Sequence, residues 1–372
     1  MTKPSIVFFV SHAAGGIREL WSDLAAGFAE RGHAVELAGL YPHGPDDVAD
    51  EQRWTYMLPN RPGGLLAKFA MLRNLAGWLR RTRPDVIITA MPAANVLLPI
   101  FAKLFNPRTR LIVTHHSPVG THNRLLDAMD GLTGRLPNVC AIVGVSDAVT
   151  QSLAGKAQAY RAKSLTIHNA LPRRVDDMLA RLAPRGPRQA LGRTVIAAGR
   201  LAEQKNYPML INAAPAMPDV RVEILGSGPD EAALRKLIAR HGVANHVHLL
   251  GHCDRASALA RVSKADIFVQ VSLFEGHSLA LLEAATLGLP LIVSNVPSQV
   301  EGITARDGSA CGLVIDLGDT DGLAHAITMV LDDPQHYALW SSRALILAQE
   351  AKFDTMMARY DSLATCIPAK SN

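Results

Sequence analysis

Two glutamates separated by seven residues form the most distinctive pattern in the sequence, Glu275 and Glu283. They follow a predicted strand over 267–271, so we expect Glu275 in the loop at a helix start and Glu283 about two turns into that helix. A carboxylate at Glu283 could accept hydrogen bonds from both hydroxyls of a ribose. Glu275 and the loop amides could hold sugar hydroxyls or a phosphate. The alternatives are compensation of the helix dipole for Glu275 and a solvated helix face for Glu283.

A basic loop follows another predicted strand, over 194–198. It begins with Gly199-Arg200 and ends with Lys205-Asn206. Two cations leaving one strand end together could clamp a diphosphate, the arginine through its planar fork and the lysine as a point charge. The alternative is an ordinary solvated basic loop.

A glycine pair, Gly15-Gly16, separates the first predicted strand, over 5–10, from a helical stripe over 17–28. Residues without side chains at a helix N-terminus let a phosphate approach free backbone N–H groups and the positive end of the helix dipole. The alternative is that the two glycines only turn the chain.

Two adjacent histidines, His115 and His116, follow a further predicted strand. Adjacent side chains of an extended chain point to opposite faces, so at most one of them faces a site. Without a nearby cluster of carboxylates or cysteines, we expect no metal centre here. A structural role is the alternative for either histidine.

Predicted strands and helices alternate along the chain, on both sides of a stretch rich in proline, glycine and arginine. This alternation indicates parallel sheets built from βαβ units, and the interruption is typical of a surface linker. We predict an N-terminal domain over 1–172, a linker over 173–193, a C-terminal domain over 194–353, and a C-terminal helix and tail over 354–372. Ligands of such sheets bind beyond the carboxyl ends of the strands, where all the candidate residues above fall.

The composition, 48% hydrophobic and 19% charged, excludes a disordered chain. Four widely spaced cysteines argue against a disulfide framework or a cysteine zinc site and favour a cytoplasmic protein. The apolar runs over 6–10 and 96–105 are too short for a signal peptide and a membrane span. We therefore expect a cytoplasmic protein, either soluble or peripheral on the inner face of the plasma membrane.

Together these loops resemble the retaining family 4 glycosyltransferases, which have the two-domain GT-B fold. The resemblance covers nearly the whole chain. It rests on Glu275 and Glu283 followed by Ala284-Ala285, on the Arg200 and Lys205 loop, and on the turn Gly226-Ser227-Gly228-Pro229. It implies an α/β protein with two Rossmann-like, doubly wound parallel-sheet domains that face a central cleft, with C-terminal helices crossing back to the first domain.

The resemblance also implies roles for these residues. Arg200, Lys205 and the Gly15-Gly16 loop would bind the diphosphate of a nucleotide sugar, and Glu283 would bind its ribose. Glu275 and His116 would be the catalytic residues near the transferred sugar, since Thr114 and His116 match the family's Thr-x-His pattern. The other implied contacts are to the donor sugar, by Gly276, His277, Ser278 and Leu279, and to the base through the backbone, by Gly251 and His252.

Two positions depart from the family pattern. The usual Glu-Gly-Phe-Gly reads Glu-Gly-His277-Ser278, and the usual Asn-Gly reads Asn169-Ala170. The first departure bears on which sugar is accepted, and neither touches the diphosphate clamp.

The implied reaction moves a hexosyl or N-acetylhexosaminyl unit from a nucleoside-diphosphate sugar with retention of configuration. UDP is the favoured nucleotide and GDP-mannose the other candidate donor. Cleavage leaves negative charge on the diphosphate, which Arg200, Lys205 and the helix start at Gly16 are placed to stabilise. We therefore expect neither a metal nor a cofactor. The acceptor attacks from the leaving-group face, and no protein nucleophile is expected.

The acceptor is expected to meet the basic first half of the chain, where residues 1–186 carry 22 Lys and Arg against 14 Asp and Glu. A predicted helix over 65–83 is basic and amphipathic and could lie on an anionic membrane surface. The favoured alternative is that its apolar side is core and its cations are solvated. We expect a glycan or lipid-linked acceptor in bacterial surface polysaccharide synthesis. We expect no nucleic acid, because the basic residues are not interleaved with stacking aromatics.

The sequence leaves two other functions open. One is a catalytically silent subunit that binds a nucleotide sugar within a larger complex. The other is a nucleotide-sugar epimerase of the same fold, which would convert its donor without an acceptor.

Overall fold

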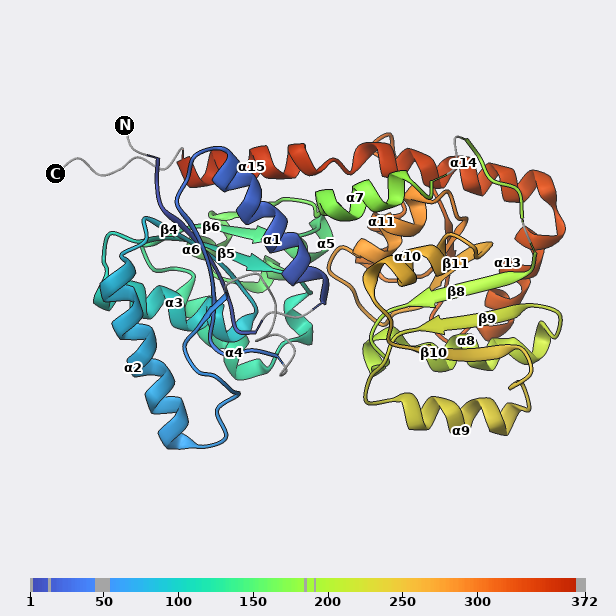
Figure 1. Ribbon diagram of the computed structural model, residues 1–372, viewed down its shortest axis with the longest axis horizontal. Coiled ribbons are helices and arrows are strands. Elements are labelled where there is room, and N and C mark those ends of the chain that lie inside the picture. Colours follow the sequence, from blue (N-terminus) through green and yellow to red (C-terminus); the bar gives the residue numbers. More distant parts are fainter. Residues whose placement is uncertain (1–2, 13–14, 44–53, 184–185, 191, 366–372) are drawn as a thin grey trace. The chain divides into compact units, whose positions relative to one another are not determined.

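The computed structural model describes residues 3–12, 15–43, 54–183, 186–190 and 192–365 (Figure 1). The chain divides into two compact units. Unit 1 comprises Met1–His168 and Phe353–Asn372, and unit 2 comprises Asn169–Lys352. Each unit contains a parallel sheet with helices packed on it, so both predicted Rossmann-like domains are present.

The sheet of unit 1 has seven strands in the order β3-β2-β1-β4-β5-β6-β7, and all its neighbouring strands are parallel. Its strands are β1 (Ile6–Val10), β2 (Val35–Gly39), β3 (Trp54–Tyr56), β4 (Val86–Ala90), β5 (Arg110–His115), β6 (Val139–Gly144) and β7 (Ser164–Thr166). Its helices are α1 (Gly15–Glu30), α2 (Leu65–Thr82), α3 (Pro92–Phe105), α4 (Arg124–Thr133), α5 (Asp147–Ser152), α6 (Gln158–Arg161) and α15 (Phe353–Thr365).

Apolar residues on both faces of the central strand explain why helices cover the sheet of unit 1 on two sides. The Phe8 ring packs against Trp21 of α1, with ring centroids 5.4 Å apart. The next residue, Phe9, packs at the same centroid distance against Trp78 of α2. Successive side chains of a strand point to opposite faces, so a continuous apolar run such as 6–10 requires cover on each.

The C-terminal helix α15 belongs to unit 1 and confirms the predicted crossing back to the first domain. It packs against α1. Its Asp361 carboxylate lies 3.6 Å from the Arg31 guanidinium and 3.5 Å from the His33 imidazole.

The sheet of unit 2 has six parallel strands in the order β10-β9-β8-β11-β12-β13. Its strands are β8 (Thr194–Ala198), β9 (Arg221–Leu225), β10 (Val247–Gly251), β11 (Ile267–Gln270), β12 (Leu291–Ser294) and β13 (Leu313–Ile315). Its helices are α7 (Arg173–Ala180), α8 (Tyr207–Ala213), α9 (Glu231–His241), α10 (Arg255–Val262), α11 (Leu279–Thr286), α12 (Pro297–Gly302), α13 (Thr320–Asp332) and α14 (Pro334–Glu350).

The predicted surface linker over 173–193 differs from the structure at its beginning. Residues Arg173–Ala180 form α7, with Pro172 at its N-cap. Val175 and Leu179, one helical turn apart, are buried in the core of unit 2. Charged residues surround this apolar pair, so the sequence shows no clear amphipathic pattern. Burial of the one apolar face is nevertheless enough to stabilise the helix.

The predicted helix over 65–83 is α2, and its apolar side is buried only in part. Met71, Leu75, Trp78 and Leu79 are buried in unit 1, as the favoured interpretation of the sequence requires. At the start of the helix that interpretation is wrong, because Leu65, Leu66 and Phe69 are 84%, 88% and 69% exposed. Figure 1 shows these first turns projecting beyond the strands of unit 1. Among the described helices, none combines the length and apolarity that crossing a bilayer requires.

Candidate active site

The Glu275 carboxylate is the centre of a polar cluster in unit 2. It is only 7% exposed, and its Oε1 atom accepts three hydrogen bonds. The donors are Lys205 Nζ at 2.6 Å, Ser272 Oγ at 2.7 Å and Gln270 Nε2 at 2.8 Å. A buried charge is tolerated when it is paired and hydrogen-bonded in this way. The two loops that the sequence assigned separately to the sugar and to the diphosphate therefore meet at one carboxylate.

Buried amide and hydroxyl groups support Glu275 from behind. Gln270 accepts a hydrogen bond from Ser278 Oγ at 2.9 Å, and Ser278 also caps α11. The backbone carbonyl of Gln270 accepts from Gln299 Nε2 at 2.5 Å. Sequence reasoning missed Gln270, Ser272 and Gln299. One signal in the sequence could have identified Gln270: it is a polar residue at the end of an otherwise apolar strand. A buried amide needs hydrogen-bond partners, so such a residue indicates a polar cluster.

The loop that carries Arg200 rests on a glycine turn. Gly226 has φ +140°, and a Cβ built on it would lie 2.0 Å from the Gly199 carbonyl oxygen. A Cβ on Gly228 would lie 2.3 Å from the Leu201 carbonyl oxygen. The turn Gly226-Ser227-Gly228-Pro229 is therefore a support for the cationic loop. Arg200 itself is exposed, at the carboxyl end of β8.

The second glutamate of the pair, Glu283, lies on α11 as predicted and is 5% exposed. Its Oε1 atom is bound by the guanidinium of Arg255, the first residue of α10. The solvated-face alternative for Glu283 is therefore wrong. Sequence reasoning also missed Arg255, because no sequence pattern links it to Glu283. A carboxylate paired in this way is available as a hydrogen-bond acceptor.

The other unit 2 candidates lie in loops or helix starts at the same edge of the sheet. Gly251 ends β10 with φ +74° and accepts a backbone hydrogen bond from Gly226 at 2.9 Å, while His252 is exposed. Gly276 is buried, His277 and Ser278 are partly buried, and Leu279 begins α11.

In unit 1, His116 is held by a threonine, as the Thr-x-His pattern requires. Thr114 Oγ1 donates to the Thr89 carbonyl at 2.7 Å and lies 2.9 Å from His116 Nε2. Because the hydroxyl proton is used, this network assigns Nε2 as the donor. Burial, with a smaller contribution from the positive charge of His115, lowers the pKa of His116 to about 3.

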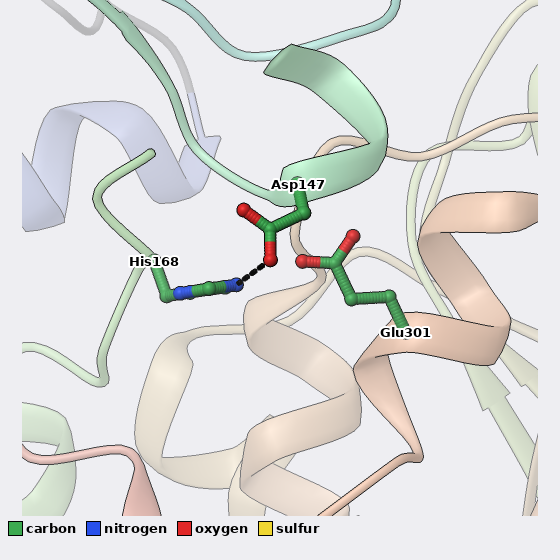
Figure 2. A group of neighbouring side chains, drawn as sticks. All are labelled: Asp147, His168 and Glu301. Atoms are coloured by element: carbon green, nitrogen blue, oxygen red, sulfur yellow. Dashed lines mark ion pairs between the residues drawn. The ribbon is translucent and has the colours of Figure 1, made fainter. Parts of the chain in front are cut away.

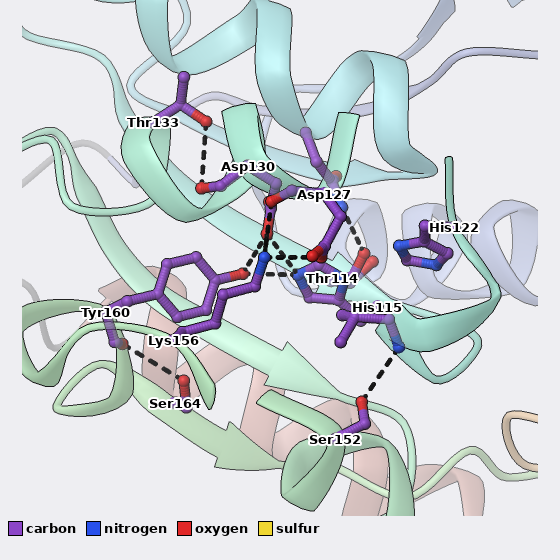
Figure 3. A network of polar contacts seen from close by, with 12 residues as sticks. Thr114, His115, His122, Asp127, Asp130, Thr133, Ser152, Lys156, Tyr160 and Ser164 are labelled. Atoms are coloured by element: carbon purple, nitrogen blue, oxygen red, sulfur yellow. Dashed lines mark hydrogen bonds and ion pairs between the residues drawn. The ribbon is translucent and has the colours of Figure 1, made fainter. Parts of the chain in front are cut away.

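The neighbouring His115 points to the opposite face, into the buried network of Figure 3. Its Nε2 atom lies 2.8 Å from the Tyr160 hydroxyl, which donates to Asp130 Oδ2 at 2.7 Å. Lys156 supplies the balancing charge, with Nζ 2.6 Å from Asp127 and 3.8 Å from Asp130. Burial, followed by the charges of His122 and Lys156, lowers the pKa of His115 to about 3. His115 is therefore a core residue, and His116 is the histidine left for a site.

Both histidines should lower the stability of the folded protein in acid. Each is neutral in the folded protein down to pH about 3 but takes up a proton in the unfolded chain below pH about 6.5. As the pH falls through this window the unfolded chain binds more protons. The free energy of unfolding should therefore fall by up to about 1.4 kcal/mol per pH unit for each histidine.

Urea unfolding of wild type and His116→Gln between pH about 7.5 and about 5 measures this effect. The variant keeps a side-chain N–H donor and cannot titrate, so its stability should depend less steeply on pH. Leu104→Gln, which introduces the same amide at an exposed position that does not titrate, is the control and should keep the wild-type slope. Equal slopes for His116→Gln and wild type would contradict the assignment.

The glycine pair of unit 1 begins a helix. Gly15 and Gly16 are the first residues of α1, whose first turn carries no acidic side chain. Nothing in that turn opposes an approaching anion, so the geometry is compatible with phosphate binding.

A different histidine–carboxylate pair lies on the surface of unit 1. Figure 2 shows His168 Nε2 facing Asp147, at 4.0 Å, and both side chains are exposed. Glu301, also drawn there, belongs to unit 2. An exposed pair of this kind is typical of a solvated surface and provides too few ligands for a metal centre.

Two family models match the chain, one to each unit. The model described as Glycosyltransferase Family 4 matches residues 14–173, and Glycosyl transferases group 1 matches residues 187–345. The chain belongs to the family 4-type GT-B glycosyltransferases. This confirms the resemblance drawn from the loops of the sequence.

Relatives of this glycosyltransferase include enzymes of polysaccharide and glycolipid synthesis. It is 34% identical over 141 residues to glycogen synthase of Mycobacterium tuberculosis. The matched segment covers 37% of this chain and 33% of that protein. The chain thus spans about a third of the length of that relative. It is 26% identical over 330 residues, 86% of each chain, to the lipopolysaccharide core biosynthesis glycosyltransferase LpsD of Rhizobium meliloti.

Solved structures agree with the fold. Anabaena Alr3699/HepE in complex with UDP and glucose superposes with a TM-score of 0.78 at 17% identity, covering 98% of this chain and 100% of that one. Sucrose-phosphate synthase from Thermosynechococcus elongatus gives a TM-score of 0.80, also at 17% identity, covering 99% and 100%. At these identities the likeness establishes the GT-B fold alone.

Proposed function

We propose that this family member is a retaining glycosyltransferase that moves a hexosyl or N-acetylhexosaminyl unit from a nucleoside-diphosphate sugar to a glycan or lipid-linked acceptor. UDP-sugars are the favoured donors, with GDP-mannose second, and the product belongs to bacterial surface polysaccharide synthesis at the inner face of the plasma membrane. The observation that carries the proposal is the contact of Lys205 Nζ with Glu275 Oε1 at 2.6 Å. It joins two motifs far apart in sequence at one edge of the unit 2 sheet.

The reaction follows from charge. The bond from the anomeric carbon to the diphosphate breaks, the acceptor oxygen bonds to that carbon on the same face, and the acceptor's proton passes to a phosphate oxygen. Negative charge develops on the departing diphosphate, where the cations of Arg200 and Lys205 stabilise it. Glu275 holds Lys205 in place and faces the sugar side of the site. In unit 1, the start of α1 at Gly15 and Gly16 is proposed separately as a phosphate contact, through its backbone N–H groups and helix dipole.

Two further features suit this chemistry, one in each unit. His116 stays neutral at physiological pH, because its pKa is lowered to about 3, so it can hydrogen-bond to a sugar without adding charge. Glu283, which Arg255 holds in place, is positioned as an acceptor for the two ribose hydroxyls. The solved GT-B structure with UDP and glucose is consistent with a uridine diphosphate donor for a protein of this fold.

A thermal-shift titration with UDP, GDP and ADP and their sugar conjugates tests the donor site. A nucleotide at about 100 times its dissociation constant should add about 2.7 kcal/mol to the stability of the wild type. Arg200→Ala and Glu283→Ala should lose most of that gain. Arg235→Ala, which removes an exposed arginine paired with Glu231 on α9, is the matched control and should keep it.

The same titration separates the alternatives. Loss of the shift in Arg235→Ala as well as in Arg200→Ala would contradict the assigned clamp. Absence of stabilisation by every nucleotide would overturn the donor site and the silent-subunit function with it. Donor binding followed by conversion of the sugar in the absence of an acceptor would identify an epimerase instead.

A further inference from the structure

The first turns of α2 carry a cluster of apolar side chains that unit 1 leaves in solvent. Leu65, Leu66 and Phe69 are 84%, 88% and 69% exposed, the first two being the most exposed large apolar residues described. They are neighbours on a single helix, and their exposure contrasts with the buried residues from Met71 onward. Single exposed apolar residues are ordinary, but a contiguous group of three large ones is typical of a binding surface.

Along the chain, the charge on either side of this cluster is of one sign. Residues 52–84 contain seven Lys and Arg and neither Asp nor Glu. Arg61, Lys68 and Arg73 of this stretch are exposed and lie within a few residues of the apolar cluster. An apolar group flanked along the chain by cations complements a surface that is apolar inside and anionic outside, which describes an anionic lipid bilayer.

The place of the cluster in the fold connects it to the site. The crossover helices of a parallel sheet begin at the edge where the strands end, so the start of α2 lies at the carboxyl edge of the unit 1 sheet. His116 follows β5 and Gly15-Gly16 follow β1 at this same edge. The start of α4 adds exposed Arg124 and Leu125 there. An acceptor embedded in lipid would be presented to this edge.

We infer that the protein docks on anionic membranes by inserting Leu65, Leu66 and Phe69 between lipids, with Arg61, Lys68 and Arg73 on the headgroups. The contact is the tip of α2 and not its whole length, since the later apolar residues are core. The membrane contact stands on this surface alone, and only its purpose, reaching a lipid-linked acceptor, rests on the proposed function.

Flotation of the full chain with phosphatidylcholine vesicles, with and without phosphatidylglycerol, tests the inference. We expect binding to the anionic vesicles that falls at least about tenfold when salt is raised from about 0.1 to about 0.5 M. Leu66→Ser with Phe69→Ser should weaken binding at least about tenfold, because insertion depends on buried apolar area. Leu104→Ser is the matched control: Leu104 is 66% exposed but lies at the end of α3, at the opposite edge of the sheet, and should bind as wild type.

Each other outcome overturns the inference. These are undiminished flotation of the double variant, equal loss in Leu104→Ser, or equal binding to neutral vesicles. Sedimentation velocity tests whether the cluster binds a second copy of the chain instead of a membrane. A wild type that is dimeric and a double variant that is monomeric would assign the cluster to a dimer interface and overturn the inference. Nucleotide thermal shifts of the same variants keep the two proposals distinct. A variant that binds nucleotide but not vesicles supports the docking surface, and a wild type that binds vesicles but no nucleotide contradicts the donor site only.

Discussion

Replacing Glu275 by glutamine should lower the turnover of the nucleotide sugar about a hundredfold to a thousandfold. The substitution keeps the size of the side chain and an oxygen that accepts hydrogen bonds, so Gln270 and Ser272 retain a partner. It removes the charge that holds Lys205 Nζ at 2.6 Å. Lys205 is then free to move, and the negative charge on the sugar side of the site is lost. Nucleotide affinity should change little, because Lys205 keeps its own charge.

Release of nucleoside diphosphate from the donor, with water as the acceptor, measures this turnover without knowledge of the natural acceptor. Nucleotide affinity is read separately from the thermal shift. Glu203→Gln is the control, since Glu203 is an exposed glutamate of the same loop as Lys205. Turnover of Glu275→Gln at the wild-type rate would rule out a catalytic role for Glu275, and equal loss in Glu203→Gln would attribute the effect to the charge of the loop.

Gly226→Ala should destabilise unit 2 by about 3 kcal/mol and weaken nucleotide binding as well. The methyl group would meet the Gly199 carbonyl oxygen at 2.0 Å, with backbone on both sides of the contact, and φ +140° disfavours any residue but glycine. Relief of the clash requires the Gly199–Leu201 loop to move. Arg200 is on that loop, so stability and diphosphate affinity should fall together.

Gly242→Ala separates the clash from the backbone conformation. Gly242 also has a positive φ, +67°, but a Cβ there would meet nothing within 4 Å. It should cost about 1 kcal/mol and leave nucleotide binding intact. Urea unfolding followed by nucleotide titration of both variants makes the comparison. Equal destabilisation of the two would show that contact with Gly199 contributes nothing.

The succession of elements was predictable because each parallel strand is a short apolar run and each crossover helix is amphipathic. The short edge strands β3 and β13 were not predicted. Each has only three residues, and the pattern of three residues cannot be told from a loop. Helix α7 falls within the predicted linker because its apolar pair, Val175 and Leu179, is too small to outweigh the charged residues beside it.

The site was predictable where one residue's own chemistry and a strand end coincide. Arg200, Lys205, Glu275 and His116 lie in the loops after their strands and Glu283 on the following helix, as predicted, while their roles stay predictions. Their partners were not predictable, because Gln270, Gln299 and Arg255 come from other elements whose distance along the chain carries no information about contact. The alternation of a strand indicated that at most one of His115 and His116 faces a site, and the choice of His116 came from the resemblance to the family's Thr-x-His pattern. Only the tertiary structure shows that the buried partner of His115 is Tyr160.

By itself the sequence determined the two parallel-sheet units, the carboxyl-edge loops and the family, since these depend on periodicity and on residues close together along the chain. Only the tertiary structure decided which polar groups share a carboxylate at Glu275, which glycine supports the Arg200 loop, and which apolar residues of α2 are covered. The physical reason is the same in each case. Burial and hydrogen bonding are properties of neighbours in space, and an apolar stripe reads identically along a helix whether a sheet lies beneath it or not.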